Sequence, residues 1–402
     1  MVLHKYFSLI YFFTILRPFP YISEMEFFVK RGVDLIWLLL ILYFYYKIGK
    51  INKFKFNIFP LSYLFLIMAV IGAASIFNAL IFLDVNVVLT DLFETYRWIY
   101  YFLVINMAFQ IKWDHYLFNR YLVQTTIAAL TVIFIITYGS LFNDHLRQFF
   151  SVFYFFKTQA TWYEYVRVSG TFTNPNFFAV FLVFALSVIT LSGVMKIYKK
   201  YLYLLLTFAL VFLTGSRTGM IGAFAIFIYV FIINLRYSSW KSLIESFLLF
   251  CSVFILSITL FNNLSRVYRT INSFTESGLS GIASLSVKYE YGLKILTMVN
   301  DLSPIIGLGA GKGFGNYLGD SQLVSIIFSY GYLGLFIYSL FWTLFIYKTY
   351  KIREYRQLSI YLILFFIFGF VGDFFFMTQI ATTLLLFYGA LISFKQKEIK
   401  KL

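Results

Sequence analysis

Two arginines stand in short, turn-rich strings between long apolar runs of this 402-residue chain. Arg167 precedes the string GTFTNPNF, which leads into an apolar run, and Arg217 is flanked by Gly215 and Gly219 between two runs with almost no loop. Arginine carries a permanent, forked set of donors that matches phosphate oxygens. An interfacial arginine ordinarily reaches lipid phosphates or a carboxylate. The flanking glycines let backbones approach closely, so the pattern favours a functional cation at Arg217.

A second group of candidate residues lies between Arg266 and Asp320. Arg266 and Arg269 are three residues apart, so a helix would place them on one face. The glycine-rich run GLGAGKGFG contains Lys312, and its amides would form a nest that meets phosphate. No strand–turn–helix context surrounds it, which argues against a dinucleotide site. Asp320 opens the next apolar run, where it serves as a helix N-cap, as a functional carboxylate, or as both.

Composition identifies the elements that must position these residues. Hydrophobic residues make up 61% of the chain, charged residues only 12%, and mean hydropathy is +0.82. A soluble domain carries about twice that charge. One cysteine and three histidines leave no cluster for zinc and no disulfide framework. We therefore predict an all-α, polytopic integral membrane protein in which residues 1–402 form a single membrane domain.

Charge in the loops predicts the topology. About 20 apolar residues span a bilayer, and twelve runs qualify. Twenty of the 33 Lys and Arg residues, with four of the 17 acidic ones, fall on one side if the N-terminus is cytoplasmic. The net charge of +16 then follows the positive-inside rule and needs no nucleic-acid partner. Both termini are predicted cytoplasmic, and no GxxxxGK[ST] string occurs, which argues against an ATP-driven pump. The predicted spans are about 5–22, 32–48, 57–83, 94–111, 121–139, 174–194, 200–215, 218–235, 243–261, 321–347, 358–374 and 377–394; the long extracytoplasmic loops are about 140–173 and 262–320.

Three strings taken together resemble the O-antigen polymerase and ligase superfamily (Wzy and WaaL). GTFTNPNFFA, LTGSRTG and IIGLGAGKGF…GDS…SYGYLG occur in that family's order, with a large outer loop before the tenth helix. The resemblance implies a GT-C-like fold in the plasma (inner) membrane and a metal- and cofactor-independent glycosyltransferase facing the periplasm or cell exterior. It implies an undecaprenyl-diphosphate-linked oligosaccharide as donor and as acceptor, surrounding membrane lipid, and a chain-length regulator as a further partner.

The resemblance also implies roles for particular residues. Arg167 and Arg217 would hold the donor's diphosphate. The chemistry of the transfer also needs a general base near the acceptor hydroxyl, for which Asp320 is the first candidate, ahead of Glu290 and Asp301. Lys288 stands roughly where many relatives have an arginine, and lysine lacks the bidentate fork. The further candidates for binding substrate are Asn174, Asn176, Arg266, Arg269, Lys288, Glu290 and Lys312.

The sequence also fits two other functions, an O-antigen ligase-type enzyme and a flippase or transporter. Ligases have a histidine pair where this chain has Asp320-Ser321, and that departure favours a polymerase over an O-antigen ligase-type enzyme. A flippase or transporter also fits twelve helices with both ends inside. Transporters place charged residues at the bilayer midplane, whereas from about residue 57 onward the interiors of the predicted spans are nearly bare of charge and the ionisable groups gather on the outer face.

Overall fold

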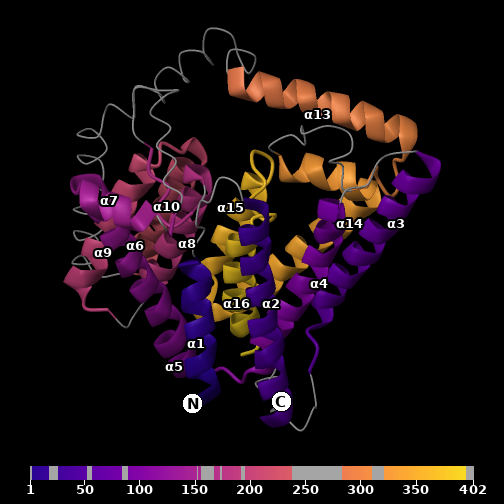
Figure 1. Ribbon diagram of the computed structural model, residues 1–402. Helices are drawn as coiled ribbons and strands as arrows, with labels where there is room; N and C mark the ends of the chain where they lie inside the picture. The colour runs from indigo at the N-terminus through magenta and orange to yellow at the C-terminus, as the bar shows by residue number, and fades with distance from the viewer. Residues whose placement is uncertain are drawn as a thin grey trace. The chain divides into compact units, whose positions relative to one another are not determined.

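The structure of the chain is a computed structural model, and the part that it describes is helical, without β-strands (Figure 1). It describes residues 2–17, 26–51, 57–83, 89–151, 153–154, 167–172, 174–191, 195–237, 283–309 and 321–394. The chain divides into two compact units: Met1–Ile36 with His115–Asn272, and Trp37–Asp114 with Ser273–Leu402. The division falls inside α2 (Glu26–Ile51).

Apart from α2, each unit has its own set of helices. Unit 1 contains α1 (Val2–Ile15), α5 (His115–Phe118), the π-helical turn η2 (Asn119–Val123), α6 (Gln124–Phe142), α7 (Asp144–Ser151), α8 (Pro175–Leu191), α9 (Ile197–Leu213) and α10 (Arg217–Tyr237). Unit 2 contains η1 (Pro60–Ser62), α3 (Tyr63–Phe82), α4 (Leu89–Gln110), α13 (Ala283–Leu302), α14 (Gln322–Tyr350), η6 (Arg353–Tyr355), α15 (Leu358–Phe368) and α16 (Thr378–Ile392).

Within the described residues, three helical stretches are long and apolar enough to cross a membrane, which agrees with the prediction of a membrane protein. They are Pro60–Phe82, His115–Phe142 and Gln322–Tyr350. Each predicted span within the described residues overlaps a helix, and the predicted span 243–261 lies outside them. The count of twelve spans and the orientation of the chain stay predictions.

In unit 1 the helices α1, α6 and α9 run in the same direction. The hydroxyl groups of Tyr11 and Thr126 are 3.0 Å apart, and the hydroxyl of Tyr154, just after α7, donates to the carbonyl of Leu16 at 2.8 Å. Burial raises the pKa of Tyr154 to about 12. The Tyr138 hydroxyl of α6 donates to a carbonyl of α9. All three helices therefore end at one end of unit 1, where α10 begins.

Unit 2 has an aromatic core. Trp98 of α4 and Phe375, which precedes α16, have ring centroids 6.1 Å apart, and Phe65 of α3 lies 4.4 Å from Phe341 of α14. The side chain of Trp98 is fully buried, and that of Phe65 nearly so. Rings of this size bury much of the apolar surface that stabilises a fold. They attach α3, α4, α14 and the segment before α16 to one another.

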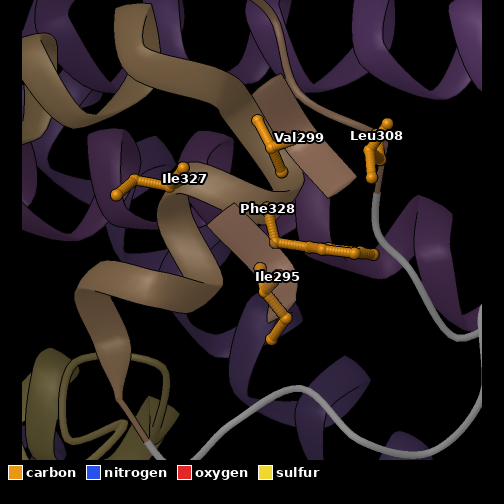
Figure 2. Packing of buried hydrophobic residues seen from close by; sticks show 5 residues of the cluster. All are labelled: Ile295, Val299, Leu308, Ile327 and Phe328. Carbon is orange, nitrogen blue, oxygen red and sulfur yellow. The ribbon is translucent and has the colours of Figure 1, made fainter. Parts of the chain in front are cut away.

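The helix α14 is broken at Gly331, which has φ +64° and ψ −167°. Its first part packs on α13 through a buried apolar cluster of Ile295, Val299, Leu308, Ile327 and Phe328 (Figure 2). Beyond the break, the amides of Tyr332 and Leu333 donate to the carbonyls of Pro304 and Ile305 at 2.9 and 3.1 Å. The part from Tyr332 to Tyr350 is about 28 Å long at 1.5 Å per residue, which matches the ~30 Å hydrocarbon core of a bilayer.

Replacing Gly331 with alanine is expected to destabilise unit 2 by at least about 2 kcal/mol. The positive φ disfavours any residue with a Cβ, and that Cβ would lie 2.2 Å from the Ile305 carbonyl oxygen. Gly292→Ala in α13 is the matched control, because its Cβ would make an ordinary 3.7 Å contact with Val324. Thermal unfolding in detergent measures both variants. Equal unfolding temperatures for the two would contradict this account of the break.

Candidate functional site

Arg167 connects two of the strings that the sequence singles out. Its Nε donates to the carbonyl of Thr214 at 2.8 Å, and its Nη2 donates to Oδ1 of Asn176 at 2.9 Å. The amide of the next residue, Val168, donates to the carbonyl of Leu213 at 3.1 Å. The segment before α8 and the turn between α9 and α10 therefore form one structure, with the guanidinium of Arg167 between them.

Two helices begin at this structure, and each has a polar cap. Asn174 precedes α8, and its Oδ1 accepts from the amide of Asn176 at 2.8 Å. Ser216 precedes α10, and its Oγ accepts from the amide of Gly219 at 3.3 Å. These are the bonds by which N-cap side chains satisfy the first amides of a helix. The structure thus gives Asn174 a capping role; contact between Asn174 and a substrate stays a prediction.

Arg217 is the first residue of α10 and is half-buried. A helix N-terminus carries about half a positive charge, so a cation there is unfavourable by roughly 0.3–1 kcal/mol. Neighbouring Ser216 is almost fully buried, at 2% exposure. A bound anion would interact favourably both with the arginine and with the helix N-terminus. The placement of Arg217 therefore suits anion binding better than it suits the stability of α10.

Glycines bring the two helices and the Arg167 guanidinium close together. A Cβ added to Gly219 of α10 would lie 2.5 Å from the Cβ of Ala179 of α8, so only glycine permits this approach. Gly215 has φ +61°, and a Cβ added there would lie 3.3 Å from Nε of Arg167. The glycines that flank Arg217 in the sequence thus serve packing and the turn beside Arg167.

The charge of this region is positive. Between Tyr165 and Ile244 the sequence contains no aspartate or glutamate, although it contains Arg167 and Arg217. Two helix N-termini add their partial positive charges. An arrangement of two guanidinium groups, backbone amides and hydroxyl groups is suited to phosphate or diphosphate. The chemistry that this site favours is the binding and stabilisation of a negatively charged group.

The other candidate residues lie in unit 2 or outside the described residues. Asp320, Lys312, Arg266 and Arg269 lie outside the described residues. Lys288 and Glu290 lie on α13 of unit 2, where the Glu290 side chain is exposed.

The glycine-rich run does not offer its first amides to a ligand. The amide of Gly307 donates to the Ser303 carbonyl at 3.0 Å, and that of Leu308 donates to the Phe328 carbonyl at 2.7 Å. The expectation of a phosphate-binding nest is therefore wrong for Gly307 and Leu308, because both amides already donate to backbone carbonyls of the protein. Residues 310–320 lie outside the described part.

In unit 2 the beginning of α14 is attached to the loop between α15 and α16. Ser321 occupies the N-cap position, and the amide of Gln322 donates to the Gly369 carbonyl at 2.9 Å. Oε1 of Gln322 accepts from the Phe375 amide at 2.8 Å. The hydroxyl of Ser325 donates to a carboxylate oxygen of Asp373 at 3.2 Å. These three hydrogen bonds join this loop to the first turn of α14, and the loop presents the partly exposed carboxylate of Asp373.

Sequence reasoning did not single out two ionisable residues that the structure makes notable. Asp373 follows a long apolar run, and only its contact with Ser325 marks it. Arg17 follows α1 and is only 2% exposed, at the end of unit 1 where α10 begins. The position of Arg17 after an apolar run is the pattern of an ordinary helix end, so only its burial distinguishes it. Within the described residues, no three of His, Cys, Asp and Glu gather as metal ligands would.

Comparison with known proteins gives no relative: no protein-family model matches the chain, and no curated protein matches it. The function is therefore inferred from the chain's own residues and from the geometry of unit 1.

Proposed function

We propose that this chain is a surface-polysaccharide polymerase of the O-antigen type. It would transfer a growing glycan from undecaprenyl diphosphate to the next lipid-linked repeat unit, at the outer face of the plasma membrane. The observation that carries the proposal is the position of Arg167. This arginine joins the segment before α8 to the turn before α10, and Arg217 begins the second of these helices. Both segments belong to the strings that resemble the superfamily.

The proposed reaction explains why the cations are needed. A hydroxyl oxygen of the acceptor forms a bond to the anomeric carbon of the donor, and the bond from that carbon to the diphosphate oxygen breaks. The electron pair leaves with the diphosphate, so negative charge develops there. Fixed donors aimed at developing charge are among the largest contributions to catalysis. Arg167 and Arg217 would supply them, and Asp320 would take the hydroxyl proton.

Because the donor carries a diphosphate, the reaction needs no further activating group. A sugar on a lipid diphosphate is already activated, so the reaction requires no nucleotide sugar. The apolar helices account for access to a lipid-linked substrate. Asn176, Arg266, Arg269, Lys288, Glu290 and Lys312 stay proposed substrate ligands, of which Asn176 contacts Arg167 directly.

Loss of the chain is expected to leave single repeat units on the cell surface. The experiment deletes the gene in its source strain and compares surface glycans before and after complementation. A ligase would leave no repeats attached, and a flippase would leave lipid-linked repeats on the cytoplasmic side; either result would overturn the polymerase. Arg147→Gln is the control variant that should complement fully, because Arg147 lies on α7, is half-exposed and pairs with Asp144 at 2.9 Å.

A further inference from the structure

The guanidinium of Arg167 is held along one edge. Its Nε and Nη2 donate to two acceptors, the Thr214 carbonyl and Oδ1 of Asn176. These two nitrogens form the side edge of the planar group. With that edge fixed, the direction of the end edge, Nη1 and Nη2, is also fixed. The end edge is one of the two forks with which arginine can grip a phosphate bidentately; the other, the side edge, bonds to protein acceptors here.

The acceptor on Asn176 is itself held in place. The backbone amide of Asn176 donates to Oδ1 of Asn174 at 2.8 Å, so Asn176 lies in the capped first turn of α8. Thr214 is completely buried. Its hydroxyl donates to the carbonyl of Val211 and accepts from the backbone amide of Ser216. Both partners of the guanidinium are therefore fixed before any ligand arrives.

The side-chain amide of Asn176 can have either of two roles. As a ligand of the substrate, it would contribute binding independently of Arg167. As a partner of Arg167, it would contribute only through the direction of the guanidinium. The 2.9 Å bond from Nη2 to its Oδ1 favours the second role, because it joins Asn176 directly to the guanidinium and fixes the direction of that group.

We propose that Asn176 is a positioning residue, which directs the guanidinium fork of Arg167 at the diphosphate of the lipid-linked donor. This proposal rests on the proposed function. It reassigns Asn176 from substrate contact to control of a cation, and it makes the asparagine in the NPN string a determinant of diphosphate affinity.

A double-mutant cycle tests the proposal. The purified full chain in nanodiscs is titrated with undecaprenyl diphosphate, and Kd is measured for wild type, Asn176→Ala, Arg167→Ala and the double variant. Losing the fixed direction of one charge-assisted interaction is expected to weaken binding about 10-fold. In the Arg167→Ala background the same change is expected to have less than about a twofold effect, because two residues that act through one contact are not additive.

Two controls keep the result interpretable. Arg147→Gln changes a half-exposed arginine of α7 that pairs with Asp144 and should bind like wild type, which shows that loss of an arginine outside the site leaves diphosphate affinity unchanged. Added guanidinium ion should restore diphosphate binding in Arg167→Ala but not in the double variant, an outcome that a purely structural role of Asn176 would not give.

The outcomes separate this proposal from the proposed function. If Asn176→Ala weakens binding by the same factor in both backgrounds, Asn176 is a direct ligand and the positioning role is wrong, while the diphosphate site stands. If Arg167→Ala binds the lipid diphosphate as wild type does, the role of Arg167 in the proposed function fails, and the positioning role fails with it.

Discussion

Replacing Arg217 with lysine is expected to abolish chain growth, although the positive charge is kept. Arg217 begins α10, beside the Ser216 cap and the turn that contacts Arg167. A lysine there would be a single-point cation, without the planar fork that binds two phosphate oxygens. Losing one fixed donor at a developing oxyanion costs on the order of 100-fold or more in rate. The length ladder of the surface polysaccharide, in a deletion strain complemented with the variant, measures this loss.

The matched control for this variant is Arg147→Lys. Arg147 is half-exposed on α7 and pairs with Asp144, so lysine can replace it. Membrane abundance of both variants must equal that of wild type, which excludes misfolding as the cause. A normal ladder from Arg217→Lys at normal abundance would show that Arg217 serves only as a lipid anchor or a structural cation.

The helices that the sequence predicts are those with continuous apolar runs. Hydropathy detects such runs because a span must be apolar over its whole length. It does not detect α7 or α13, which fall inside the predicted loops 140–173 and 262–320. A helix such as α13 needs only a narrow apolar stripe, here Ile295 and Val299, to pack on a neighbour. The break in α14 at Gly331 is also missed, because its carbonyl and amide partners come from residues 304–308.

For the candidate site, sequence reasoning identifies the residues but not their connections. Arg167 and Arg217 are singled out in the sequence because each is a charged residue in a short, glycine-containing string between long apolar runs. The contact between Arg167 and Thr214 joins residues separated by two helices, α8 and α9, and no local pattern encodes it. For the same reason the sequence predicts Asn176 only as a substrate ligand, and the bond from Arg167 to its Oδ1 is seen only in the structure. Such pairings depend on how α8 packs on α10, which is decided by Gly219 and Ala179.

Replacing Asp320 with asparagine or serine is expected to stop chain growth while the protein still folds and inserts. Both residues are good N-caps, so they remove only the ionisable group that would accept the hydroxyl proton. Asp320 itself lies outside the described residues, but α14 begins at Gln322 and Ser321 occupies its N-cap position. The Ser321 side chain makes no capping hydrogen bond, so the substitutions are what separate a capping role of Asp320 from a role as the base.

The remaining substitutions at Asp320 separate a base from a cap. Glutamate keeps the carboxylate but moves it by one methylene, so partial activity is expected. Histidine can accept the same proton near neutral pH and is expected to restore some chain growth. If Asp320 were only a cap, asparagine and serine would be silent, and alanine would cost roughly 1 kcal/mol. Full ladders from the asparagine and serine variants, at normal membrane abundance, would remove Asp320 from catalysis. Asp373, which the Ser325 hydroxyl holds beside the first turn of α14, would then be the carboxylate of unit 2 to test next.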